Sequence, residues 1–531
     1  MTTAVPKQVT AGASPLTHSP LPWVLGCGAL SALIWWHFFA DAFPLGQYYA
    51  QGHVDYAWIT QYRPEGSLTF MAALGALFGL AWIAQQRLQG ETSLDALGVV
   101  LGGHVAFSAV LRGMYPAAAV DIYDYYLYGR ISLLHGGNPF TQPPRAFPED
   151  PYLYLSPWQA EPSVYGPIWQ ILSLIPTALA GNDLLLAIGL FKVTAILGSL
   201  ITSVLIYVTL KYLAPERAIA GTLFFAWNPL VLFETAGNGH NDSVMTAFMM
   251  LGVYALLVGP RWAALPGLAA AVLTKVPSVL LGPLLLAGVL RSDRWPRAVR
   301  VAGIGIAISL LLAIVTYAPF WQGLPTLSFL GRGHWFTASP ATILRELLRQ
   351  QGMEFEAANQ SATLISAALF GLVYVVSLML YWRSVDSSAP RSSTPHQVAD
   401  MTPGAGAPRI THHSSLITLH WLRAAYRVTM AYLVIAALWW HAWYLIMLIC
   451  FAALLGDKRL EMRCNLFCFG GLLSYVVFKY VWWYWEPTGD YFRIMLVSVI
   501  AIFSLPALHW LTSFLDQFER IDESARHTHR G

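Results

Sequence analysis

Apolar and polar segments alternate along the whole chain, and the apolar runs determine its architecture. Most of these runs are long enough to cross about 30 Å of hydrocarbon as a helix. The pattern therefore predicts an all-α polytopic membrane protein, a bundle of about 14 transmembrane helices. The expected spans are residues 22–40, 68–86, 95–112, 184–210, 218–235, 242–258, 263–275, 276–290, 298–318, 361–382, 425–440, 443–456, 465–483 and 491–511.

One apolar stretch, residues 164–180, is expected not to span the membrane. Gln170, Ser173 and Thr177 recur in it at helical spacing and form a polar stripe, which is typical of a helix lying in the membrane interface. With that stretch left out and the N-terminus placed in the cytoplasm, the lysines and arginines of the short loops collect on the cytoplasmic side. A long loop that carries interfacial helices, residues 113–183, then faces outward.

Composition agrees with this class of protein. Apolar residues make up 56% of the chain and charged residues 11%, whereas soluble domains carry about 25% charge. The net charge of +3 forms no basic patch, so nucleic acid is not an expected partner. Cys464 and Cys468 have no further ligand nearby, and no metal site is predicted. The expected organisation is a cytoplasmic tail (1–21), a transmembrane core (22–382), a Ser/Pro/Gly-rich cytoplasmic linker (383–420), C-terminal transmembrane helices (421–511) and a second cytoplasmic tail (512–531).

The start of the long loop carries the densest group of polar side chains. Read as a helix, residues 121–135 place two carboxylates, two phenols and an imidazole on one stripe. Such a stripe suits a site for a hydroxyl-rich molecule, although a solvated loop with interfacial tyrosines would have the same sequence. The stripe consists of Asp121, Asp124, Tyr125, Tyr128, Ser132 and His135, and Arg130 lies beside it.

Three later segments add ionisable residues at helix ends. Glu234, His240 and Asp242 crowd the outer membrane edge, where charges favour a polar cavity, although Asp242 could also be a simple helix cap. Lys275 precedes Pro277 in an apolar stretch, which favours a buried cation that holds a phosphate or, alternatively, a lysine that snorkels. A glycine-rich loop with Arg332 and His334 could clamp an oxyanion or be an ordinary loop.

The order of these motifs resembles the GT-C glycosyltransferases. The likeness is greatest to polyprenol-phosphate-mannose-dependent α-(1→6)-mannosyltransferases of the MptB type, and it extends to glycosyltransferase family 87. Ala119 and Val120 stand where that family commonly has an arginine and a serine, which leaves the sugar and the linkage open. The motifs are Asp121-Ile-Tyr-Asp-Tyr, Gly137-Asn138-Pro139-Phe140, Tyr165-Gly166-Pro167, Asn228-Pro229-Leu, Gly239-His240-Asn241-Asp242, Lys275-Val-Pro277 and, more weakly, Trp439-Trp440-His441-Ala-Trp443-Tyr444.

This resemblance implies an inverting hexosyltransferase of a bacterial plasma membrane, with its active site outside the cytoplasm. A polyprenyl-phosphate sugar, with mannose as the expected sugar, would be the donor, and a glycan or glycolipid the acceptor. Asp121 would be the catalytic base, and Asp124, also in the catalytic site, could orient the acceptor or the sugar or raise the pKa of the base. Lys275, Arg332 and Arg130 would bind the donor phosphate. No organic cofactor is implied, and the need for a divalent metal is left open. The expected substrate-binding residues are Tyr125, Tyr128, Asn138, Tyr165, Glu234, His240, Asp242, His334, His441 and Tyr444.

A transporter or flippase for a lipid-linked or polar solute is the alternative. Transporters commonly have related halves and a site near the midplane of the membrane. Here the ionisable groups gather at one side and no two halves match. A cavity at one membrane face, lined by Asp121, His240 and Lys275, would favour the enzyme, whereas a continuous path through the membrane would favour transport.

Overall fold

The computed structural model describes residues 19–52, 54–332, 335–387, 412–482 and 491–528. Helices make up most of this part of the chain, and it contains no strand, as expected for an all-α membrane protein. Apolar side chains on the outer helices remain exposed, as they would if lipid surrounded them. In α16, only 11% of the most apolar window is buried, against 61% in the α19 span, so α16 lies at the periphery and α19 inside the bundle.

Eight helical segments are long and apolar enough to cross a membrane, and a bent pair would make a ninth. The expected count of about 14 is therefore not confirmed in the described part of the chain. Several expected spans form shorter apolar helices instead, because glycine and proline end them early. The eight are α1 (Leu21–Trp35) with η1 (Trp36–Ala40), α4 (Pro64–Arg87), α5 (Leu94–Arg112), α8 (Leu184–Leu213), α14 (Trp295–Tyr317) with η8 (Ala318–Phe320), α16 (Phe355–Ser387), α19 (Lys458–Val476) with η12 (Val477–Val481), and α21 (Tyr491–Thr528).

The bent pair and the remaining helices, most of them shorter, complete the bundle. The pair is η4 (Pro215–Arg217) with α9 (Ala218–Ala226), followed by α10 (Pro229–Leu232) with η5 (Phe233–Gly237). The others are α11 (Asp242–Val258), η6 (Arg261–Ala263), α12 (Ala264–Thr274), η7 (Val276–Leu281), α13 (Gly282–Arg291), α17 (His412–Ala431) with η10 (Tyr432–Ala436), and η11 (Ala442–Tyr444) with α18 (Leu445–Leu455).

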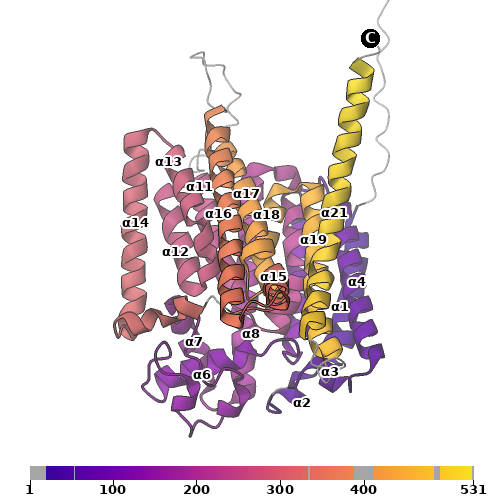
Figure 1. The fold of residues 1–531 in the computed structure, drawn as a ribbon. Helices are drawn as coiled ribbons and strands as arrows, with labels where there is room; N and C mark the ends of the chain where they lie inside the picture. Colours follow the sequence, from indigo (N-terminus) through magenta and orange to yellow (C-terminus); the bar gives the residue numbers. More distant parts are fainter. Residues whose placement is uncertain (1–18, 53, 333–334, 388–411, 483–490, 529–531) are drawn as a thin grey trace, which may run out of the picture.

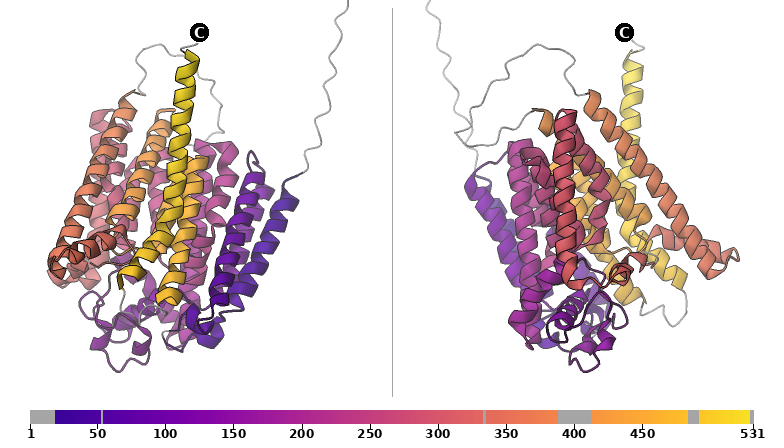
Figure 2. Two further views of the ribbon diagram at one scale, coloured as in Figure 1. Left: turned by 45° about the vertical axis from the view of Figure 1, so that its right-hand side comes forward. Right: turned by 90° about the vertical axis from the view of Figure 1, so that its left-hand side faces the viewer.

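A lobe of short helices covers one end of the bundle (Figures 1 and 2). We call residues 113–183 the loop lobe, since they correspond to the long outward loop expected from the sequence. The lobe contains α6 (Asp121–Leu133), η2 (Pro144–Ala146), η3 (Leu153–Leu155) and α7 (Pro167–Ala180). Nearby lie α2 (Leu45–Tyr48) and α3 (Tyr56–Ile59), while η9 (Leu324–Arg332) and α15 (Pro340–Gln350) connect α14 to α16.

The polar stripe of α7 faces the protein. Gln170, Ser173 and Thr177 are buried, whereas Ile175 and Leu179 on the opposite face are 59% and 67% exposed. At 14 residues the helix is shorter than the spanning helices. The helix thus differs from an ordinary surface helix, because its polar side packs on α6 and its apolar side is left for lipid.

Helix also occupies both ends of the expected linker and part of the expected C-terminal tail. α16 runs to Ser387, α17 begins at His412, and α21 continues to Thr528. The centre of the linker, residues 388–411, lies outside the described residues.

Close packing of two short helices positions the site. α11 and α12 touch at Gly252 and Gly267, where an added Cβ would lie 2.8 Å from the backbone of the other helix. Small residues allow such an approach between helices in a membrane. As a result, the start of α11, at Asp242, lies beside the residue that follows α12, Lys275.

Candidate functional site

A cavity of about 430 Å³ lies between the loop lobe and the ends of the central helices. Its inner part carries Asp121, Tyr165 and Lys275, while the rest of its wall is mostly apolar and aromatic. It therefore joins a charged end to an apolar end. The remaining lining residues are Val164, Val276, Pro277, Val279, Leu280, Phe329, Leu330, Trp335, Tyr432, Ala436, Leu438, Trp439, Trp443 and Tyr444.

Asp121 is the first residue of α6 and the carboxylate that lines this cavity. Tyr165 donates a hydrogen bond of 2.8 Å to its Oδ1, and His240 Nε2 lies 3.6 Å from its Oδ2. Burial alone would raise the pKa of Asp121, but the bonds and charges of His240, Lys275 and Tyr165 hold it well below its usual value. Asp121 is therefore an ionised acceptor at the cavity wall.

Asp124 lies one helical turn further on, behind the cavity. It is 2% exposed, and Ser156 donates a hydrogen bond to its Oδ1, while its Oδ2 is buried without a partner. Burial raises the pKa of Asp124 well above its usual value, and the charge of Asp121 acts in the same direction against the lowering bond from Ser156. The protonated form of Asp124 is therefore favoured more than in an ordinary aspartate.

A second layer of polar residues supports Asp121 from behind. His240 Nδ1 lies 2.9 Å from Glu234 Oε2, so the imidazole links two carboxylates. Burial lowers the pKa of His240, but the bonds to Asp121 and Glu234 dominate and raise it to about 9. Glu234 also accepts hydrogen bonds of 2.9 Å from Asn238 and 2.8 Å from Tyr475. It lies in the π turn η5, a rare element that is frequent at functional sites.

Lys275 pairs with Asp242 where the start of α11 lies beside the end of α12. Its Nζ lies 2.5 Å from Asp242 Oδ2, and the lysine side chain is 12% exposed where it borders the cavity. The chain leaves α12 at Lys275 in an extended conformation before Pro277, as the sequence predicted for a broken helix. Asp242 is thus the buried partner of a cation as well as the first residue of α11.

An aromatic wall surrounds the lysine. Its Nζ lies 5.6 Å from the ring centroid of Tyr444, 5.7 Å from that of Trp443 and 6.0 Å from that of Tyr165. Trp443 also stacks between His240, at 4.0 Å, and His441, at 4.2 Å. Burial lowers the pKa of His441 to about 3, so this imidazole is neutral. The wall offers both aromatic faces and a cation to a ligand.

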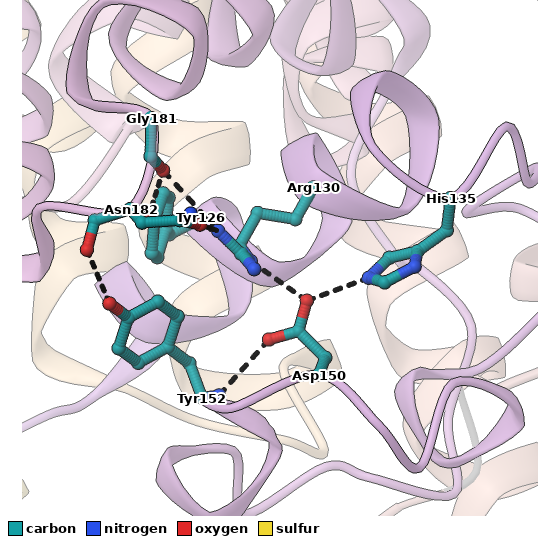
Figure 3. Close-up of polar contacts among 7 residues, drawn as sticks. All are labelled: Tyr126, Arg130, His135, Asp150, Tyr152, Gly181 and Asn182. Atoms are coloured by element: carbon teal, nitrogen blue, oxygen red, sulfur yellow. Dashed lines mark hydrogen bonds and ion pairs between the residues drawn. The ribbon is translucent and has the colours of Figure 1, made fainter.

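Arg130 belongs to a separate cluster inside the loop lobe, and it is not among the residues that line the cavity (Figure 3). Its Nε donates to Asp150 over 2.8 Å and its Nη1 to Asn182 over 2.8 Å. His135 Nε2 lies 2.7 Å from the same oxygen of Asp150. This cluster joins the end of α6 to the loop after η2 and to the turn after α7, so its geometry supports the lobe and gives Arg130 no position beside Lys275.

Three other expected site residues, like Arg130, are not among the residues that line the cavity. The Tyr125 hydroxyl bonds Asn241 over 3.4 Å, Tyr128 bonds the Glu161 carbonyl over 2.9 Å, and the Asn138 amide bonds the Phe320 carbonyl over 2.6 Å. Tyr128 thus bonds within the lobe, whereas Tyr125 and Asn138 attach the lobe to the rest of the fold. His334 and the side chain of Arg332 lie outside the described residues.

Several residues of the site gave little signal in the sequence. Tyr475 and Ser156 are single hydroxyl-bearing residues far from any motif, and their roles depend on contacts across the fold. Trp443 stands in a motif that was noted only for its neighbours His441 and Tyr444. Trp335 and Trp439 line the cavity. In the sequence, tryptophans near the membrane edge indicate an aromatic belt and do not by themselves predict a binding site.

Fold and site together define a polytopic membrane protein with a cavity at one end of its helical bundle, lined by the charged side chains of Asp121 and Lys275. The family described as Alpha-(1->6)-mannopyranosyltransferase, N-terminal domain, matches residues 24–291, about half of the chain. The chain therefore belongs to this MptA_B family, which confirms the resemblance drawn from its motifs.

Two curated relatives agree with this assignment. The chain is 25% identical over 237 residues to Alpha-(1->6)-mannopyranosyltransferase A of Corynebacterium glutamicum, a match that covers 41% of this chain and 48% of the relative. It is 25% identical over 285 residues to the protein of the same name from Mycobacterium tuberculosis, covering 52% and 53%. The chain thus spans about half the length of the curated relatives it matches, and no solved structure matches it.

Proposed function

We propose that the protein is an inverting mannosyltransferase that moves mannose from a polyprenyl phosphate to a glycan or glycolipid on the extracytoplasmic face of a bacterial plasma membrane. The observation that carries this proposal is the cavity itself, with Asp121 and Lys275 at one end and apolar residues at the other. A lipid-linked sugar phosphate has the same order of parts. Family membership and two bacterial relatives that are named mannopyranosyltransferases support the choice of reaction.

The donor would enter with its lipid along the apolar wall. Val279, Leu280 and Leu330 offer contacts for an isoprenoid chain, and Val279 is 48% and Leu330 60% exposed toward the surroundings. The phosphate would then reach Lys275, whose Nζ is already held by Asp242. An ammonium in a cavity of low polarity binds a phosphate strongly, because little water competes for it.

The reaction would break the bond between the sugar C1 and the phosphate oxygen. An acceptor hydroxyl attacks C1 from the opposite face, its proton passes to Asp121, and polyprenyl phosphate leaves with its charge beside Lys275. Phosphate needs no protonation to leave, so one base is sufficient. The burial of Asp124 behind the cavity supports Asp121 for that role, since Asp121 is the carboxylate that lines the cavity.

The acceptor would approach from the side of three tryptophans. Trp158, Trp335 and Trp439 lie with ring centroids 5.2–5.9 Å apart, and Trp335 and Trp439 border both the main cavity and a second cavity of about 390 Å³. Aromatic faces are suitable platforms for the apolar faces of sugars. This arrangement supports a glycan or glycolipid acceptor on the aqueous side of the lobe.

The test supplies purified full-length protein in nanodiscs with radiolabelled polyprenyl-phosphate mannose, glucose or arabinose and a membrane extract as acceptor. We expect label from mannose to enter an acceptor and inversion at its C1. Transfer from none of the three donors, with donor binding absent as well, would refute the proposal. Movement of the intact donor across the bilayer without transfer would establish a flippase instead.

A further inference from the structure

A third cavity, on the other side of η10 from the catalytic cavity, has the chemistry of a lipid site. It has a volume of about 780 Å³ and is formed by α16, by α17 with η10, by α19 and by α21. It shares no lining residue with the catalytic cavity. Its wall is apolar except for three arginines and one tyrosine, and its lining is Val373, Arg423, Tyr426, Arg427, Met430, Ala431, Val434, Ile435, Leu460, Arg463, Phe467, Phe503, Pro506, Ala507 and Trp510.

The order of residues along α17 and η10 separates charge from apolar surface. Arg423, Arg427, Met430 and Val434 follow each other at steps of three and four residues and therefore lie on one face. The arginines come first, and side chains on a helix lean toward its N-terminus. α17 begins at the end of the bundle opposite the loop lobe, so the guanidinium groups reach toward that end and the apolar residues lie deeper.

α19 repeats this order on the facing wall. It also begins opposite the lobe, and Arg463 precedes Phe467 by one turn. α21 runs the other way, so Phe503 is deep and Trp510 is nearer the arginines. Tryptophan at such a level is typical of the membrane interface. The groove therefore carries positive charge near the end of the bundle opposite the lobe and is apolar deeper in the bundle.

The three arginines have no ion-pair partner among the described residues. Arg463 Nε is buried without any hydrogen-bond partner in the structure. Two acids on or beside α19 are used elsewhere, because Glu461 pairs with Arg217 and bonds Gln85, and Asp457 caps the start of α19. Three arginines without an acidic partner among the described side chains, beside an apolar groove, favour the binding of an anion.

We propose that this groove binds an anionic phospholipid of the leaflet opposite the catalytic cavity. Its phosphate would accept hydrogen bonds from Arg423, Arg427 and Arg463, and an acyl chain would lie on Val434, Phe467 and Phe503. Basic groups between membrane helices bind acidic head groups in this way. The site is independent of the proposed mannosyltransferase reaction, since it uses none of the residues that line the catalytic cavity.

The test measures lipid binding to the purified full-length protein by native mass spectrometry. The lipids are phosphatidylglycerol and phosphatidylcholine with identical acyl chains, so that only the net charge of the head group differs. We expect phosphatidylglycerol to bind in preference to phosphatidylcholine. The triple variant R423Q/R427Q/R463Q should weaken phosphatidylglycerol binding by roughly 100-fold, because each basic residue contributes to attraction of an acidic lipid.

Two further variants make the result specific. R294Q/R300Q removes two exposed arginines near the same end of the bundle, and phosphatidylglycerol should bind it like the original protein. Val434→Trp fills the apolar part while keeping every arginine, and it should also weaken binding. Equal binding of both lipids, or a triple variant that retains phosphatidylglycerol, would overturn the proposal. Tighter binding of polyprenyl phosphate, lost in the same triple variant, would replace the phospholipid as occupant and overturn it too.

Discussion

Asp121 and Asp124 are one helical turn apart, yet their surroundings shift the pKa values of the two carboxyls in opposite directions. Asp121 faces Lys275 and His240 at the cavity, whereas Asp124 points into the lobe toward Ser156. The sequence placed both on one stripe, and a turn of three residues is enough to separate them. At the scale of single residues, function therefore depends on which side of α6 a carboxylate occupies.

Asp121→Asn should reduce turnover by about 10²–10⁴-fold, because the amide keeps the shape and cannot accept a proton. Asp124→Asn should change turnover by less than about tenfold, since Asp124 does not line the cavity and the amide has the same size as the carboxyl. Both variants are compared in nanodiscs, with donor binding measured separately from transfer. If Asp124→Asn were inactive and Asp121→Asn near normal, the assignment of the base would be wrong.

Lys275→Met should weaken donor binding, because it removes the cation beside the cavity while leaving the aromatic wall. The single change also leaves Asp242 buried without its partner, so instability could imitate a binding defect. The double variant Lys275→Met/Asp242→Asn removes both charges and should fold well while still binding the donor poorly. Lys275→Arg should keep part of the affinity, and Lys211→Met, an exposed lysine at the far end of α8, should keep all of it. Normal donor affinity in the double variant would show that Lys275 does not bind the donor and has only a structural role.

His240 should make stability depend on pH. Its pKa in the folded protein is about 9, against an ordinary value of 6.5, so its bonds to the two carboxylates stabilise the fold fully below about pH 6.5. That contribution should be lost as the pH rises through about 9. The Tm of the protein should therefore exceed that of His240→Gln at low pH, and the difference should shrink toward high pH. A difference that is constant across this range would contradict the protonated state of His240.

At the scale of helices, the start of α7 is fixed against α12 at a single glycine. Gly166 donates a backbone hydrogen bond of 3.1 Å to the carbonyl of Thr274, and an added Cβ would lie 2.0 Å from the carbonyl oxygen of Leu273. Tyr165 and Lys275, the immediate neighbours of these two contacts, both line the cavity. The glycine in the Tyr165-Gly166-Pro167 motif thus sets the distance between two parts of the site.

Gly166→Ala should therefore impair transfer by at least about tenfold without unfolding the protein, because α7 must shift away from α12 and take Tyr165 with it. The control is Gly98→Ala in α5, where nothing lies within 4 Å of the added methyl group. That variant should be as active as the original protein and slightly more stable, since alanine favours a helix more than glycine does. Transfer rates and Tm values of the two variants, measured side by side, give the comparison. Full activity of Gly166→Ala would show that the contact between α7 and α12 does not determine the geometry of the site.

The sequence could predict elements better than contacts. Apolar periodicity was sufficient for the long helices, and the polar stripe of Gln170, Ser173 and Thr177 set α7 apart from them. The direction of that stripe could not be inferred, because a polar face turned to water and one turned to α6 have the same spacing. The motifs indicated Asp121, His240 and Lys275, but Arg130 and Asn138 occur in equally good motifs and serve the lobe. Pairing partners such as Asp150 and Tyr475 are defined only by the fold.

At the scale of the whole molecule, the catalytic cavity and the groove with three arginines lie on either side of η10. The catalytic cavity lies beside the lobe, and the three arginines belong to the first parts of α17 and α19, helices that begin at the other end of the bundle (Figure 1). Positive residues favour the cytoplasmic side of a membrane protein. The turn between α13 and α14, with Arg291, Arg294 and Arg297, is also at the end away from the lobe. This charge distribution supports the proposal that the lobe faces outward.

This orientation predicts which positions react with a membrane-impermeant thiol reagent in intact cells. Glu149→Cys is exposed in the loop lobe and should be labelled, whereas Arg294→Cys is exposed in the turn before α14 and should be labelled only after the membrane is opened. The four native cysteines are buried, so a single introduced thiol should dominate the signal. Two controls establish accessibility: both variants should react equally in detergent, and both should retain transfer activity. Labelling of Arg294→Cys in intact cells, with protection of Glu149→Cys, would place the catalytic cavity in the cytoplasm. A donor presented on the outer leaflet could not then reach Lys275, so this one measurement constrains the sidedness of the whole proposed reaction.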